Sequence, residues 1–209
     1  MVPIGVTAAP PGAAPEAPES PDIDHRPGGN NNDNSCRKGT VCQHQRGLEI
    51  FRFASAPTLD ETGHMEVADL NEDMQAGIGG ALEAGFAEGN AVKTLFSRPG
   101  FSLTYAWFKS GFPLPLHTHN ADCLYYIVAG TLQLGTETLG AGDGFFIGAG
   151  KAYRYTPGPD GVEVLEFRSE ENFDIKFMAK TLPAWAKITD VIKERRPAWA
   201  TETPPSAAR

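Results

Sequence analysis

Two stretches of the 209-residue chain decide its fold: GFPLPLHTHNADCLYYIVAG at residues 111–130 and GDGFFIGAGKAYRYTP at residues 142–157. In the first stretch, one residue separates His117 from His119, so in an extended strand both side chains project to the same side. Neutral imidazoles placed in this way can hold one divalent metal ion. The first stretch therefore predicts a strand that presents paired ring nitrogens.

The region around these stretches is rich in short β-type runs. Each run is bounded by Gly, Pro, Asn or Asp, and they lie at residues 101–108, 124–128, 131–134, 144–147, 152–155, 162–167 and 173–177. Close, regular spacing of this kind favours an all-β sandwich or barrel over alternating strands and helices.

Both stretches resemble the motifs of the cupin superfamily. The first cupin motif is Gly-x5-His-x-His-x3/4-Glu-x6-Gly, and the second is Gly-x5-Pro-x-Gly-x2-His-x3-Asn. The positions that match the first motif are Gly111, His117, His119, Cys123 and Gly130, and those that match the second are Gly142, Gly148, Gly150, Tyr153 and Pro157. The resemblance covers about residues 100–178 and implies a double-stranded β-helix, the jelly-roll barrel.

Two positions depart from the ligand set that the resemblance implies. A metal-binding cupin supplies two His and a Glu from the first motif and a third His from the second. Here Cys123 stands at the Glu position and Tyr153 at the third His position. One interpretation is a divalent metal (Fe, Mn, Ni, Cu or Zn) held by His117, His119 and Cys123 as thiolate, with Tyr153 as a rarer phenolate ligand. The other is a barrel without a tightly bound metal.

A third interpretation comes from another cupin branch. Thiol dioxygenases carry a Cys at the Glu position, joined to a Tyr near iron. Cys123 with Tyr153 or Tyr155 is similar, but this chain lacks the third His of that branch. The alternative for Cys123 is a small buried apolar residue.

Further residues are predicted to line an interior pocket with an aromatic surface and several hydroxyls, which suits a small apolar or aromatic ligand. They are Tyr105, Trp107, Tyr125, Tyr155 and Glu166. Glu163 has the opposite strand parity to Glu166, so only one of them can face inward, and a solvated outer face is the default for either. Asp122 is one residue out of register and is expected to face outward.

The rest of the chain divides into four predicted parts. Residues 1–45 form a Pro-, Gly- and Asn-rich arm that we expect to be disordered. Residues 46–98 form an extension that packs on the barrel, with a strand at 48–53 and a helix at 72–86. The barrel occupies residues 99–180. Residues 181–209 form a helix at 183–195, followed by a tail, and Pro197 is expected to end the helix.

Charge and composition exclude some functions. The net charge of -8 repels nucleic acid and anionic membranes, and no basic patch offsets it. No run approaches the length of a membrane span, and no secretory signal opens the chain, so a cytoplasmic location is the default expectation. Cys36 and Cys42 are expected to be reduced and unpaired.

Two functions follow. The first is a small-molecule enzyme of dioxygenase, isomerase or lyase type, in which His117 and His119 hold a metal or act as acid and base. Tyr153 would donate or accept a proton, which requires a nearby metal or cation to lower its pKa. The second is a non-catalytic module that binds a small molecule. The resemblance also implies a homodimer.

Overall fold

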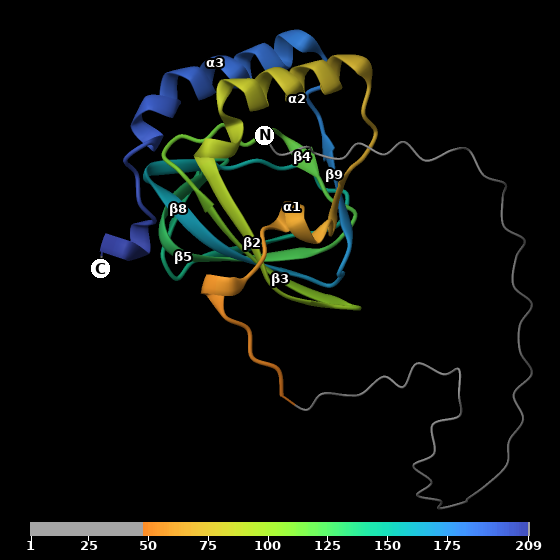
Figure 1. Ribbon diagram of the computed structural model, residues 1–209, viewed down its shortest axis with the longest axis vertical. Coiled ribbons are helices and arrows are strands. Elements are labelled where there is room, and N and C mark those ends of the chain that lie inside the picture. The colour runs from red at the N-terminus through yellow and green to blue at the C-terminus, as the bar shows by residue number, and fades with distance from the viewer. Residues whose placement is uncertain (1–47, 209) are drawn as a thin grey trace, which may run out of the picture. The chain divides into compact units, whose positions relative to one another are not determined.

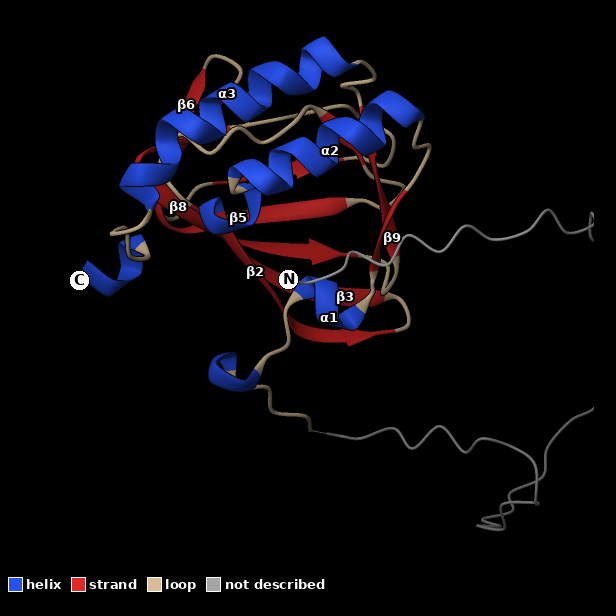
Figure 2. Ribbon diagram, turned by 45° about the horizontal axis from the view of Figure 1, so that its top comes forward, coloured by secondary structure: helices blue, strands red, loops and turns tan. Residues whose placement is uncertain are grey.

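The computed structural model describes residues 48–208, and its compact unit begins at Phe51. The predicted arm, with Cys36 and Cys42, lies outside the described residues. Two sheets face each other, and helices cover one end of them (Figures 1 and 2). This arrangement confirms the predicted double-stranded β-helix.

The larger sheet carries most of the chain's β structure. Its strands are β2 (Asn90–Arg98), β3 (Phe101–Phe108), β8 (Thr156–Arg168), β5 (Cys123–Leu134) and β6 (Glu137–Gly140), hydrogen-bonded in the order β2-β3-β8-β5-β6. A further strand, β7 (Gly144–Ile147), pairs with β5. The smaller sheet has the order β1-β9-β4, formed by β1 (Met65–Val67), β9 (Phe173–Phe177) and β4 (His117–Thr118).

The predicted runs 124–128 and 131–134 form a single strand, β5, whose pairing with β8 shifts register near Gly130. Gly130 has a φ of 75°, and a Cβ there would meet the Gly161 carbonyl oxygen at 2.2 Å. A residue with a side chain cannot occupy this position without moving the neighbouring backbone. The glycine that closes the first motif is therefore fixed by the close approach of two strands.

Two long helices lie on the barrel, α2 (Glu72–Ala84) and α3 (Leu182–Trp199). They pack against each other where the bare backbone of Gly77 meets the Trp185 ring. Short elements complete the fold: η1 (Phe53–Ser55), α1 (Leu59–Thr62), η2 (Phe86–Gly89) and η3 (Pro205–Ala208). No helix within residues 48–208 is long and apolar enough to cross a membrane.

Two predicted strands do not form, and Pro197 does not end its helix as predicted. Residues 48–52 form no strand, because Leu48 and Ile50 are exposed and their alternation buries no face. Residues 152–155 form no strand either, and only Tyr153 makes a β-bridge, to His117. Pro197 lies inside α3 and does not end it, because the next turn is held by Trp199, whose Nε1 donates to the Ser110 carbonyl.

Candidate functional site

The two sequence motifs meet in the backbone. The His117 amide donates to the Tyr153 carbonyl at 3.1 Å, and the Tyr153 amide donates back to the His117 carbonyl at 3.0 Å. The Gly150 amide donates to the His119 carbonyl, and Gly150 has a φ of 75°, which favours glycine. These bonds place Tyr153 beside the histidine pair, with 4.5 Å between the ring centroids of His117 and Tyr153.

The orientation of both imidazoles is fixed by backbone carbonyls. His117 Nδ1 lies 2.7 Å from the Pro115 carbonyl oxygen, and His119 Nδ1 bonds the Asp174 carbonyl. Because a carbonyl oxygen only accepts, each Nδ1 carries the hydrogen and each Nε2 keeps its lone pair. Burial lowers the pKa of His117, and it lowers the pKa of His119 to about 3 with help from the positive charge of Arg168. Both rings are therefore neutral bases near neutral pH.

Phenol hydroxyls lie beside the imidazoles. The hydroxyls of Tyr125 and Tyr153 are hydrogen-bonded to each other, and Tyr155 is buried next to them. Burial raises the pKa of all three phenols, and the negative charge of Glu166 adds to this effect. The nearby cation Arg168 does not reverse the shift in Tyr153, so the lowering of its pKa that a proton-transfer role requires is not present, and Tyr153 holds its proton.

An ion pair completes the buried group. Glu166 faces inward across from Tyr125, and Arg168 faces inward across from Cys123. Arg168 Nη2 donates to Glu166 Oε2 at 2.6 Å, and the guanidinium lies over the Phe173 ring at 4.0 Å. Phe173 belongs to the small sheet and contacts the His119 ring. The pair therefore spans the interior between the two sheets.

Comparisons with known proteins found similar solved structures. No family model matches the sequence, and no curated protein matches it. A polyketide cyclase, RemF, from Streptomyces resistomycificus is 18% identical, with 48% of this chain and 84% of that chain covered and a TM-score of 0.41. A Ralstonia eutropha protein of unknown function with a cupin-like fold is 18% identical, with 72% of this chain and 89% of that chain covered and a TM-score of 0.43. An RmlC-like cupin from Shewanella frigidimarina is 22% identical, with 40% of this chain and 78% of that chain covered and a TM-score of 0.36.

The hydrogen bonds between the two motifs and the strand order give the double-stranded β-helix that the resemblance to cupins implies. Within this barrel the structure brings together His117, His119, Cys123, Tyr125, Tyr153, Tyr155, Glu166 and Arg168, all buried. We call these eight residues the interior cluster.

Two residues predicted to line the pocket lie on the other face of the sheet. Tyr105 donates to Glu163 Oε1 at 2.6 Å, and Trp107 is the strand partner of Glu163. Their neighbours Ala106 and Phe108 belong to the core instead. The assignment of Tyr105 and Trp107 to the interior is therefore wrong, because periodicity shows which residues share a face and not which face is inside.

The two strand glutamates have opposite parity, as expected, but neither is solvated. Glu166 lies inside the barrel, while Glu163 is buried on the outer face, where it accepts hydrogen bonds from Tyr105 and Ser206. The C-terminal turn η3 thus covers an outer position that strand alternation alone assigns to water. Asp122 is exposed, as expected, and accepts a hydrogen bond from the Ala149 amide.

The interior cluster does not fit a three-residue metal centre. Within residues 48–208, no three His, Cys, Asp or Glu side chains converge as a ligand set. Burial raises the pKa of the Cys123 thiol to about 12, and the Glu166 carboxylate is bound to Arg168. Only the two imidazole Nε2 atoms remain as ready donors, so the predicted set of His117, His119 and Cys123 is not assembled.

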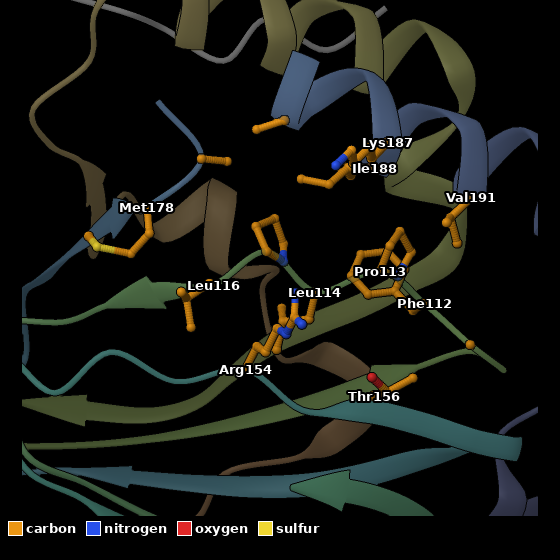
Figure 3. Close-up of a pocket in the computed structure, with 14 residues that line it drawn as sticks. Phe112, Pro113, Leu114, Leu116, Arg154, Thr156, Met178, Lys187, Ile188 and Val191 are labelled. Atoms are coloured by element: carbon orange, nitrogen blue, oxygen red, sulfur yellow. The ribbon is translucent and has the colours of Figure 1, made fainter. Parts of the chain in front are cut away.

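A cavity of about 560 Å³ lies between α3 and the segment 111–116 (Figure 3). Apolar side chains such as Leu114, Met178 and Ile188 line it, together with Arg154 and Lys187. No residue of the interior cluster contributes to its wall. Arg154 reaches it because its side chain points away from the interior, opposite to Tyr153 and Tyr155.

Proposed function

We propose that the interior cluster is the active site of a small-molecule enzyme of isomerase or lyase type, which moves a proton on a small, partly aromatic substrate. The single observation that carries this proposal is a neutral imidazole, His117, fixed beside a protonated phenol, Tyr153, in a buried site. A base and an acid side by side are the minimum for removing a proton at one atom and delivering one at another.

His117 is the better base of the two imidazoles. The pKa of His119 falls to about 3, whereas the negative charge of Glu166 opposes the fall in the pKa of His117. A proton accepted at Nε2 of His117 leaves Nδ1–H on the Pro115 carbonyl, which stabilises the imidazolium that forms. His119 then serves to bind and orient.

Tyr153 is the hydrogen-bond donor in this proposal. Its hydroxyl is hydrogen-bonded to Tyr125, which fixes its position for donating a hydrogen bond to the negative charge that forms on the substrate. The Tyr125 ring is itself held by stacking on Phe145, with 4.5 Å between ring centroids. The donor is therefore positioned by packed neighbours.

A metal plays no part in the proposed step. Dioxygenase chemistry belongs to centres with a fuller ligand set than the two Nε2 atoms offered by the described residues. The isomerase and lyase types require only the acid and base that the interior cluster provides.

The test uses 5-nitrobenzisoxazole, a small aromatic compound. A base removes its one reactive C–H proton, the N–O bond breaks, and a nitrile and a phenolate form. We expect the wild-type protein to accelerate this reaction over buffer and His117→Ala to lower kcat/KM about a hundredfold or more. His64→Gln, which changes a histidine outside the interior cluster, is the matched control.

A second part of the test compares a buried phenol, Tyr153 of the second motif, with an exposed one, Tyr126 of β5. Tyr153→Phe is expected to lower the rate about tenfold, because the donor to the departing oxygen is lost. Tyr126→Phe changes an exposed phenol on the outer face and should leave the rate unchanged. A wild-type rate equal to that of buffer, with binding of the compound retained, would instead favour the non-catalytic binding module.

A further inference from the structure

Arg168 has hydrogen-bond donors that no residue in the described chain uses. Its side chain is buried, with 3% of the residue exposed. Of its five N–H groups, one bonds Glu166 at 2.6 Å and another reaches Thr104 Oγ1 at 3.4 Å. The Nε–H is buried without a partner. Because a buried donor left unpaired destabilises the fold, this one calls for an acceptor.

The charges of the interior cluster indicate what kind of acceptor fits. Glu166 lies 2.6 Å from Arg168 and balances its charge, and both imidazole Nδ1 atoms bond backbone carbonyls rather than carboxylates. The charge of Arg168 is therefore already offset within the cluster. A ligand with a fixed charge would leave that charge buried without a counterion, whereas an uncharged carbonyl oxygen would not.

The position of the guanidinium is fixed from several sides. Arg168 lies at the end of β8 across from Cys123, over the Phe173 ring, and close enough to His119 to lower its pKa. Glu166 and Thr104 hold two of its other nitrogens. A donor held in this way needs no rearrangement when negative charge forms nearby, which is the requirement for stabilising an oxyanion.

We propose that Arg168 binds the carbonyl oxygen of an uncharged substrate and stabilises the negative charge that forms on that oxygen during the reaction. This rests on the proposed acid–base function. The C–H bond next to the carbonyl breaks, its proton goes to Nε2 of His117, and its electron pair forms a C=C bond while the carbonyl electrons move to oxygen. In a β,γ-unsaturated ketone or aldehyde this step gives a dienolate bound at Arg168, and the imidazolium returns its proton to the γ carbon, so that the C=C bond moves into conjugation with the carbonyl. The substrate class is therefore an uncharged β,γ-unsaturated ketone or aldehyde.

The charge stays balanced in this step, since the imidazolium offsets the enolate. The same balance predicts how a stable oxyanion mimic binds. A phenol that enters the barrel uncharged can pass its proton to His117 and remain as phenolate at Arg168.

The experiment uses 4-nitrophenol, whose phenolate absorbs visible light. It is titrated into the wild-type protein at a pH below the pKa of the free phenol, and 4-nitroanisole, which cannot ionise, is the matched ligand. We expect a bound phenolate signal in the wild type and an affinity about tenfold or more weaker in Arg168→Lys, which keeps the charge but loses the planar set of donors. Binding of 4-nitroanisole should not change.

Two further variants keep the test decisive. Glu166→Gln/Arg168→Met removes both charges, which avoids an unpaired buried carboxylate if Arg168→Lys fails to fold, and it should abolish the phenolate signal. Arg154→Met removes an arginine that points away from the interior and should leave the signal unchanged. A wild-type protein that binds 4-nitrophenol without forming phenolate, or an Arg168→Lys affinity equal to wild type, would overturn the role of Arg168.

The two proposals fail in different ways. If His117→Ala leaves the elimination of 5-nitrobenzisoxazole unchanged, the acid–base function is wrong, and nitrophenolate binding still decides the role of Arg168. If His117→Ala lowers the elimination rate while nitrophenolate binding is the same with and without Arg168, the acid–base function is supported and the role of Arg168 as the carbonyl subsite is wrong.

Discussion

His119 links the interior cluster to the stability of the whole protein. Its pKa in the folded state is about 3, because burial and then the charges of Arg168 and His117 disfavour the imidazolium. In the unfolded chain the ordinary value is 6.5. At pH values between these two pKa values, His119 is protonated in the unfolded state and neutral in the folded state. Its contribution to the free energy of unfolding is therefore fully present above the pKa of the unfolded state and is lost as the pH falls towards the pKa of the folded state.

We therefore expect the free energy of unfolding, measured by urea titration, to fall between about pH 7 and about pH 4.5 in the wild type. His119→Gln removes one titrating group and should show a smaller fall over the same range, while His117 keeps part of the effect. An equal fall in both proteins would show that His119 is not desolvated in the folded state.

The histidines, Cys123 and Tyr153 could be found from the sequence because fixed spacing from glycines marks them. Arg168 could not be found in the same way. It shares the parity of Glu166, two residues earlier on the same strand, but an arginine at a strand end is usually solvated. Only the structure shows that Phe173, from the other sheet, covers it.

At the scale of elements, the packing of α2 on α3 depends on the missing side chain of Gly77. A Cβ at this position would lie 2.3 Å from Trp185 Cγ, and the Trp185 ring is held by a hydrogen bond from Nε1 to the Ala179 carbonyl. The ring cannot move aside without breaking that bond. Gly77, a residue type that destabilises a helix interior, is thus required for packing.

Gly77→Ala is expected to destabilise the protein by about 1–3 kcal/mol through overpacking. Gly80→Ala, in the same helix with nothing within 4 Å of the new Cβ, should instead stabilise it by up to about 1 kcal/mol, since alanine favours the helix. Thermal or urea unfolding of the two variants measures the change in the free energy of unfolding relative to the wild type, which we expect to have opposite signs. A stabilising Gly77→Ala would mean that the helices do not meet at Trp185.

Three strands of the barrel have the bounds that the sequence predicts. The runs at 101–108, 144–147 and 173–177 coincide with β3, β7 and β9, because each is short, apolar on at least one face and bounded by turn residues. The run at 48–53 has the same alternation but finds no partner strand. Strand β2 was not predicted, because its residues pair with β3 without a clear alternation of buried side chains.

At the scale of the molecule, large apolar side chains on the outer face of the large sheet are exposed to solvent. Leu124, Tyr126 and Phe146 lie on the adjacent strands β5 and β7, and Leu124 and Phe146 are 51% and 60% exposed. Neighbouring exposed apolar residues of this kind are typical of surfaces that become covered by a partner. The homodimer that the cupin resemblance implies stays a prediction, and this face is where we place it.

Size-exclusion chromatography with light scattering is expected to give twice the mass of one chain, and Phe146→Glu should reduce it to the mass of one chain. Leu182→Glu, which changes an exposed apolar residue at the start of α3, is the control and should leave the mass unchanged. A wild-type mass equal to one chain would remove the homodimer.

The central claim is that the cupin barrel of this chain acts through its own acid and base without a bound metal. The most direct test is to purify the protein without chelator or affinity tag and to measure bound Fe, Mn, Ni, Cu and Zn by mass spectrometry, in the wild type and in His117→Ala/His119→Ala. We predict far less than one equivalent of any of these metals per chain in both proteins, even after loading the wild type. Near one equivalent in the wild type, lost in the double variant, would contradict the claim and establish a metal site built on the two imidazoles.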